Sequence, residues 1–505
     1  MSIVESIAEG KPIYLGEAQN RLYGDIWLLE HIAEKTGIRR DLEVVFDENK
    51  QIVDDIMTIA MFPYLTQYNY NRLARWQRVA ATPSVRELTP KAITLLTQSI
   101  TENHRMELLK LREERLGDEE LCTVDSTTRS AYGWTLADIH WGKNKERLPL
   151  KQTTEVVAYT LDSHMPVYYR TFPGNMPDSR SLGVILNDLK NAGFKNIVVI
   201  TDRGYESTRN LEEYISSGQS VITCVKVGQK EAFKIIESLG EFDTRPKGLT
   251  IDRDSMVYFK QYDVDYEIEG KKTNGLKLNI YFDPIRRSEE LLTLDVELSY
   301  QEEELIKLLE NKAVLGDDAW IKKEFNYFIV KYDKVTRVIE SYEENEKILS
   351  KLKKVSGFFA IMSYGVDYDA MEVFRTYRLR DEQEKYFQQM KDQMVADRQR
   401  AWSEEGKTGR SFILFVSLTL SSYVRYIWKS TALHKLLSSS FEILDEMKPI
   451  RLVEYPDTSN MITPFVGLQI NICNEFDFDI PTGCAPVNAA LKKPSQKRGR
   501  PPKQR

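Results

Sequence analysis

Residues 196–205 read NIVVITDRGY, and this stretch determines the fold that we expect. The run IVVIT is apolar and β-branched without alternation, which is typical of a strand buried on both faces. The strand ends at Asp202, and the Arg-Gly-Tyr that follows predicts a turn. On its own, an acid in this place is explained equally well as a turn residue.

The segments on either side extend the pattern. Before this strand come three short strands and a helix, and after it come a second helix and a further strand. They are LCTVD (121–125), TEVVAYTLDS (154–163), MPVYYRTF (165–172), DSRSLGVILNDLKNAG (178–193), STRNLEEYISSG (207–218) and SVITCVKV (220–227). The order β-β-β-α-β-α-β is the ribonuclease H-like arrangement, with Asp125 and Asp202 ending its first and fourth strands. We therefore predict an α/β core, α+β over the whole chain.

The rest of the chain divides around this core. We expect an all-helical, DNA-binding region over residues 1–118, with one of its helices ending before Pro63. The core would occupy 119–228 and 356–475. A mainly β insertion over 229–355 would separate its halves, because residues 255–283 alternate like a hairpin. Residues 476–505 are Pro-rich and basic, and we expect them to be disordered.

A second informative stretch is YRLRDEQEKYFQQMK, residues 377–391, which has a helical composition without Gly or Pro. At about 100° per residue, Tyr377, Arg380, Glu384 and Lys391 fall within a stripe about 60° wide. A carboxylate flanked by two cations and a phenol suits a metal ion held beside a polyanion. The alternative is an ordinary solvated helix with ion pairs.

Composition limits the class of protein. The 505 residues are 42% hydrophobic and 29% charged, as in globular proteins. We find neither a signal-peptide pattern nor an apolar run suited to spanning a membrane, so we expect a cytoplasmic protein. The family resemblance described below implies that it is prokaryotic and nucleoid-associated. The four cysteines show no CxxC spacing, which argues against a zinc site. The net charge is −6, although residues 492–505 form a tail that contains basic and no acidic residues. The rest of the chain is therefore more acidic than the net charge indicates.

Together, VDSTT, TDRGY and the spacing Tyr-x2-Arg-x3-Glu-x6-Lys resemble bacterial insertion-sequence transposases with an Asp-Asp-Glu active site. The resemblance is to the branch with a β-rich insertion between the second Asp and the Glu. It implies that Asp125, Asp202 and Glu384 bind two Mg²⁺ or Mn²⁺ ions and are catalytic. It also implies that Tyr377, Arg380 and Lys391 contact DNA. Trp320 is the single tryptophan of the insertion, and no motif around it assigns it a role.

The implied activity is DNA transposition, a form of DNA recombination. The enzyme would act as an endonuclease at the transposon ends and join their 3′-hydroxyls to target DNA by two-metal phosphoryl transfer. The implied partners are double-stranded DNA, at the ends and the target, and a second copy of the chain in a homodimer on DNA. Two other functions stay open: an inactive transposase-derived DNA-binding protein, and a metal-dependent nuclease without strand transfer.

The tail contains a further motif. Arg498, Gly499, Arg500 and Pro501 resemble the core of an AT-hook, which lies in the minor groove of A·T-rich DNA. Glycine allows close approach to the groove floor, and the arginines suit its negative potential. The alternative is a basic tail that binds any polyanion.

Overall fold

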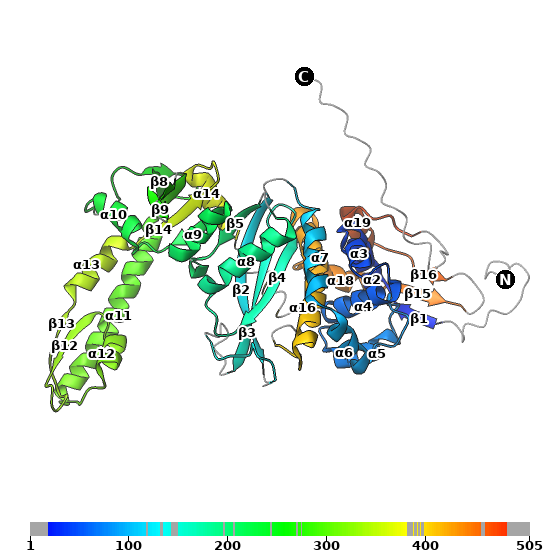
Figure 1. Cartoon of the computed structure of the whole chain (residues 1–505), viewed down its shortest axis with the longest axis horizontal. Helices are drawn as coiled ribbons and strands as arrows, with labels where there is room; N and C mark the ends of the chain where they lie inside the picture. The colour runs from blue at the N-terminus through cyan, green and yellow to red at the C-terminus, as the bar shows by residue number, and fades with distance from the viewer. Residues whose placement is uncertain are drawn as a thin grey trace, which may run out of the picture. The chain divides into compact units, whose positions relative to one another are not determined.

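The structure, a computed structural model, describes residues 19–481 except 118–119, 132–134, 143–149, 195–196, 206–207, 243–244, 269–270, 274, 381–386, 388–390, 392–393, 395–397 and 456–459. The chain forms two compact units, shown in Figure 1. The first unit comprises residues 1–197 and 380–505, and the second comprises residues 198–379. Each is described by itself.

The amino-terminal part of the first unit is helical, as expected, apart from one short strand. Its elements are β1 (Gln19–Leu22), α2 (Gly24–Lys35), α3 (Ile38–Val45), α4 (Lys50–Thr66), η2 (Tyr70–Arg72), α5 (Leu73–Gln77), α6 (Pro90–Ser99) and α7 (Glu102–Glu113). The start of α6 follows from its sequence, because Pro90 is the first helical residue and the Thr89 hydroxyl accepts the Ala92 N–H at 3.3 Å.

The expectation that a helix ends before Pro63 is wrong, because α4 continues through this residue to Thr66. Proline has no N–H, so the helix loses one backbone hydrogen bond at this point. However, every residue from Ile59 to Leu65 is buried. Burial of this apolar surface, at roughly 25 cal/mol per Å², holds the last turn of α4 in place.

Three antiparallel strands follow: β2 (Glu120–Ala131), β3 (Lys151–Thr160) and β4 (Pro166–Pro173). The meander was expected, but the expectation that Asp125 ends the first strand is wrong. Asp125 lies inside β2 opposite Val157, and pairing continues to Ala131 opposite Lys151. The β-branched Thr127 and Thr128 favour continuation of the strand.

Helices of the first unit pack against β4, among them α7 and two further ones. One is α8 (Asp178–Ala192), which ends at Gly193 with a φ of +102°, as predicted for a glycine cap. The other is α16 (Glu404–Ser430), which also packs against α4 and α6. A Cβ at Gly409 would lie 1.9 Å from the Thr97 carbonyl oxygen, so α6 and α16 approach closely.

Within the described part of the chain, α16 alone is long and apolar enough to cross a membrane. Its most apolar window is 78% buried in the protein, as in a core helix. The unit ends with α17 (Leu433–Leu436), α18 (Ser440–Met447), β15 (Arg451–Glu454), β16 (Met461–Ile462) and α19 (Leu468–Phe476). The strand β15 pairs with both β1 and β16 and so joins distant parts of the sequence.

The second unit is built on a mixed sheet with the order β5-β6-β14-β11-β8-β7. Its elements are β5 (Ile197–Thr201), which begins at the unit boundary, η3 (Arg203–Tyr205), α9 (Thr208–Ser217), β6 (Ser220–Val225), α10 (Lys230–Ser238), β7 (Thr250–Asp252), β8 (Val257–Asp263), β11 (Leu276–Phe282) and β14 (Phe358–Tyr364). The pair β5 and β6 is parallel and the others are antiparallel. The α/β class and the predicted order of elements are thus confirmed.

The expectation of a mainly β insertion is wrong, because the described residues of 229–355 also form four helices. Besides α10 they are α11 (Pro284–Glu310), α12 (Asp318–Glu324) and α13 (Glu346–Val355), with the short strands β9 (Tyr266–Ile268), β10 (Lys271–Thr273), β12 (Phe328–Tyr332) and β13 (Ile339–Glu344). The predicted hairpin exists as β8 and β11, but β11 also pairs with β14 and extends the sheet. The sequence does contain a start signal for α11, because Asp283 caps the helix and Pro284 is its first residue.

The expectation of one helix over residues 377–391 is also wrong. The helix α14 (Ala370–Arg378) ends with Leu379 as its cap, whose N–H bonds back to the carbonyl of Thr376. Tyr377 therefore lies in the last turn of α14, and Arg380 follows the helix. Tyr377 and Arg380 therefore do not lie on one face of a common helix, as the predicted 60° stripe requires.

Candidate active site

Asp202 directly follows β5, where the sequence places it. All five residues of β5 are buried, and the chain then turns into η3, with the Tyr205 N–H donating to the Asp202 carbonyl at 3.0 Å. The Asn210 side-chain amide donates to the Tyr205 carbonyl at 2.5 Å. The turn that carries Asp202 is therefore tied to the following helix, α9.

A buried hydroxyl network lies directly before Asp202. The Thr201 hydroxyl donates to the Thr223 hydroxyl at 3.0 Å and lies 3.2 Å from the Tyr214 hydroxyl. Thr201 and Thr223 are opposite each other in the parallel pair β5 and β6. We did not predict this network, although both strand sequences, IVVIT and SVIT, place a threonine at corresponding positions.

Tyr377 joins a second sequence motif to this acid. Its hydroxyl donates to Asp202 Oδ1 at 3.3 Å, although 175 residues separate the two in the chain. The position of Tyr377 follows from α14, which begins with a capping box between Asp369 and Glu372. A hydrogen bond from a phenol restricts the orientation of the Asp202 carboxylate but leaves it negatively charged. A carboxylate that binds a cation needs this charge.

Asp125 lies on β2 in the first unit. Its side chain is 8% exposed, and Oδ1 accepts the N–H of Ser126 at 2.7 Å. Pairing with β3 extends on both sides of Asp125, from Cys122 to Ala131, so its backbone is fixed, which suits a ligand or catalytic group. Asp125 and Asp202 belong to different compact units.

The remaining predicted residues are placed only in part. Arg380 follows the end of α14, and Lys391 has helical backbone geometry. Glu384 lies outside the described residues, as do Arg498, Gly499, Arg500 and Pro501. The roles inferred for all of these residues remain predictions.

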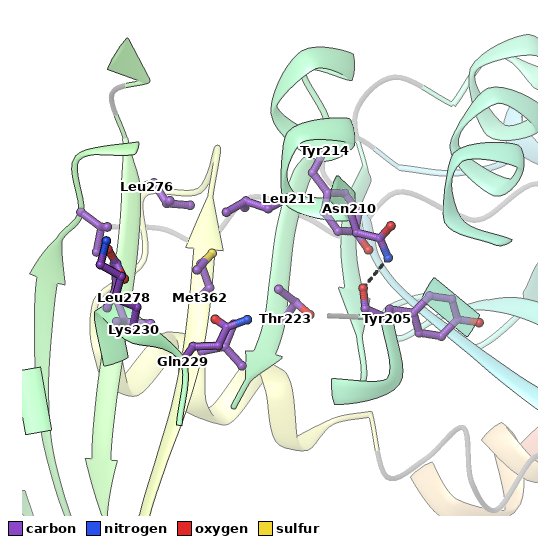
Figure 2. Close-up of a pocket in the computed structure, with 13 residues that line it drawn as sticks. Tyr205, Asn210, Leu211, Tyr214, Thr223, Gln229, Lys230, Leu276, Leu278 and Met362 are labelled. Carbon is purple, nitrogen blue, oxygen red and sulfur yellow. Dashed lines mark hydrogen bonds between the residues drawn. The ribbon is translucent and has the colours of Figure 1, made fainter. Parts of the chain in front are cut away.

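A cavity of about 430 Å³ lies in the second unit, close to the Asp202 turn. Figure 2 shows Tyr205 and Asn210, joined by their hydrogen bond, toward one side, and Leu276, Leu278 and Met362 toward the other. Most of the lining is apolar core, and the single acid among the lining residues is Glu231. The cavity is therefore not a carboxylate site. One of its lining residues is Tyr205, the last residue of the turn that follows Asp202.

The donor set of the candidate site consists of carboxylates, and Mg²⁺ and Mn²⁺ prefer such oxygen ligands. In the described ranges, no cluster of three or more His, Cys, Asp or Glu side chains has the spacing of a metal site. Asp125 and Asp202 fit hard-cation chemistry by residue type, and the third predicted ligand, Glu384, falls in the gap at 381–386.

Comparison with known proteins identifies the family. Residues 116–420, more than half of the chain, match the family described as "Transposase DDE domain", so the chain belongs to this family. No curated protein sequence matches it.

The solved structures that are similar to the chain include two transposase complexes with DNA. One is the piggyBac transposase synaptic complex with hairpin DNA, with 10% identity, a TM-score of 0.38, and coverage of 83% of this chain and 70% of that chain. The other is the Mos1 transposase paired-end complex with the left transposon end, with 12% identity, a TM-score of 0.16, and coverage of 32% and 56%.

Proposed function

We propose that this protein binds the ends of an insertion sequence, cleaves the DNA there and joins the 3′-hydroxyl ends to target DNA. The family gives the class of reaction. The observation that best supports the proposed site is the hydrogen bond from Tyr377 to Asp202. This bond connects the first residue of the Tyr-x2-Arg-x3-Glu-x6-Lys motif to the acid that follows β5. Such a connection is expected if both motifs belong to one site.

Asp125, Asp202 and Glu384 would hold two Mg²⁺ or Mn²⁺ ions. When bound, such ions activate water or a DNA 3′-hydroxyl and stabilise the leaving oxygen. In this proposal Tyr377 orients the Asp202 carboxylate, while Arg380 and Lys391 bind phosphates of the DNA end. The helical residues 1–118 would add DNA contacts, and two copies of the chain would act together on two ends.

The proposal is tested with duplexes taken from the DNA that flanks the gene. The purified chain should bind the flanks that carry terminal inverted repeats and nick them in the presence of Mg²⁺. Binding to these flanks no tighter than to scrambled duplexes, together with no nicking, would contradict the proposal.

Replacing Tyr377 by phenylalanine should slow cleavage by about 10- to 100-fold, because one hydrogen bond to a charged group is worth about 1.5–3 kcal/mol. The ring remains, so the packing of α14 is kept. If the hydroxyl acts by orienting Asp202, the Mg²⁺ concentration for half-maximal cleavage should rise, while DNA affinity and its salt dependence stay unchanged. A variant with weaker DNA binding and an unchanged metal requirement would assign Tyr377 to DNA instead.

Arg380→Ala and Lys391→Ala should each weaken binding to the transposon end. Each loss of a phosphate contact should reduce the slope of log affinity against log salt by about 0.9. The matched control is Lys435→Ala, on α17. The same salt slope in wild type and both variants would show that neither side chain contacts phosphate.

The tail is tested by deletion of residues 492–505. If the Arg-Gly-Arg-Pro element binds the minor groove, deletion should cost more affinity on an A·T-rich duplex than on a G·C-rich duplex at the same salt concentration. Metal-dependent cleavage should persist. Equal losses on both duplexes would mean a non-specific basic tail.

A further inference from the structure

A group of basic side chains outside the predicted acid site gathers around Tyr70 in the first unit. Arg129 lies near the end of β2, Arg400 precedes α16, and Arg410 lies in the second turn of α16. The guanidinium carbon of Arg410 is 5.5 Å from the centroid of the Tyr70 ring. Burial, and then the charges of Arg129 and Arg400, lower the pKa of Arg410, so the positive charges act on one another.

Arg410 itself has an aromatic partner, Tyr70. Its guanidinium lies over the Tyr70 ring, and within the described part of the chain it forms no ion pair and no hydrogen bond. A cation–π contact is a weak interaction, whereas burial beside two like charges disfavours the charged guanidinium. A buried positive charge of this kind usually has a carboxylate beside it, but here its neighbours are an aromatic ring and two further arginines.

The neighbouring Gln399 adds an independent observation. Its backbone N–H donates to the Ser130 carbonyl at 2.9 Å, which fixes the segment beside β2. Its side chain is 5% exposed, yet neither its amide nitrogen nor its amide oxygen has a hydrogen-bond partner in the structure as described. Burial of an unsatisfied amide destabilises the protein, and a hydrogen bond to an incoming polar group would remove that destabilisation.

Arg129 sets the geometry of this group. Its side chain is 6% exposed, and it donates to the Arg398 carbonyl at 3.2 Å. A guanidinium nitrogen also lies 3.8 Å from a carboxylate oxygen of Glu155 on β3. These contacts hold the Arg129 guanidinium in place. Arg129 lies on β2, four residues after Asp125 in the sequence.

We propose that Arg410, Arg129, Arg400 and the Gln399 amide form an anion site that binds a phosphodiester of DNA. The planar guanidinium group matches phosphate geometry with two parallel hydrogen bonds, and the amide can donate a further one. Tyr70 holds Arg410 in position before binding. The choice of DNA as the source of the phosphate rests on the proposed function, whereas the anion site does not.

The first experiment measures the binding of duplex DNA to the full chain at several salt concentrations. Arg410→Gln removes the charge and keeps most of the side chain, and Lys429→Gln, in the exposed last turn of α16, is the matched control. We expect Arg410→Gln to weaken binding about tenfold and to reduce the salt slope by about 0.9. Arg410→Lys should restore part of the slope and less of the affinity. An Arg410→Gln variant that binds like Lys429→Gln would overturn the DNA assignment.

The second experiment uses inorganic phosphate and no DNA. Phosphate should raise the thermal midpoint of the wild type more than chloride at equal ionic strength, and Arg410→Gln should lose this difference. Gln399→Leu removes the unsatisfied amide, so it should raise the midpoint without phosphate and reduce the gain from phosphate. Equal gains in wild type and Arg410→Gln would overturn the anion site. A phosphate effect that needs Arg410, without any effect on DNA binding, would support the anion site and contradict a DNA source.

Discussion

Alanine in place of Asp125, Asp202 or Glu384 is expected to reduce DNA cleavage by about 10³-fold or more, because each removal takes a carboxylate from a two-metal phosphoryl-transfer site. Asp202 occupies a turn that is fixed by η3 and by Asn210, and Asp125 lies on a strand whose pairing with β3 extends on both sides of it. Removal of either side chain should leave the backbone in place. Binding of end DNA should therefore persist in all three variants.

The measurement is single-turnover cleavage of end-labelled DNA at saturating Mg²⁺, with affinity measured separately. Two exposed acids serve as matched controls: Glu405 at the start of α16 in the first unit and Asp367 in the second. Their alanine variants should cleave at the wild-type rate. A near-wild-type rate in one of the three test variants would remove that residue from the site.

The second large effect concerns stability. Phe415→Ala should destabilise the first unit by about 3–5 kcal/mol, as large-to-small substitutions of buried aromatic residues do. Phe415 is 1% exposed on α16, and its ring centroid lies 4.9 Å from that of Tyr169 on β4. The loss should appear as a lower denaturant midpoint of the unfolding transition of this unit.

The control for this change is Leu436→Ala on α17, where the leucine is 57% exposed. It should shift the midpoint little, because little apolar surface leaves water at this position. Similar midpoints for Phe415→Ala and Leu436→Ala would mean that α16 is not the core helix of the unit.

The parts of the fold predicted correctly from the sequence depend on local signals. The unbroken apolar run of β5, the turn after Asp202 and the glycine cap at Gly193 each act within a few residues. The order of strands and helices follows from such signals, and it was confirmed. The acid after β5 was located correctly for the same reason.

The errors arise where tertiary contacts outweigh local preference. Pro63 stays helical because the surrounding turn is buried. Asp125 lies inside its strand because pairing with β3 continues beyond it. The contact of Tyr377 with Asp202 spans 175 residues, and no local pattern predicts which hydrogen bond a tyrosine will form.

The most direct test of the proposed function is a strand-transfer assay. Pre-cleaved end DNA with a free 3′-hydroxyl is incubated with the wild-type chain, Mg²⁺ and a supercoiled target plasmid, and the products are sequenced across the junctions. We expect the 3′ end of the transposon strand to be covalently joined to the target, and we expect no such product with Glu384→Ala. End DNA that stays unjoined in this assay, although the same preparation nicks uncut end DNA, would indicate a nuclease. End DNA that is bound but neither nicked nor joined would indicate an inactive DNA-binding protein, so either result would contradict the account.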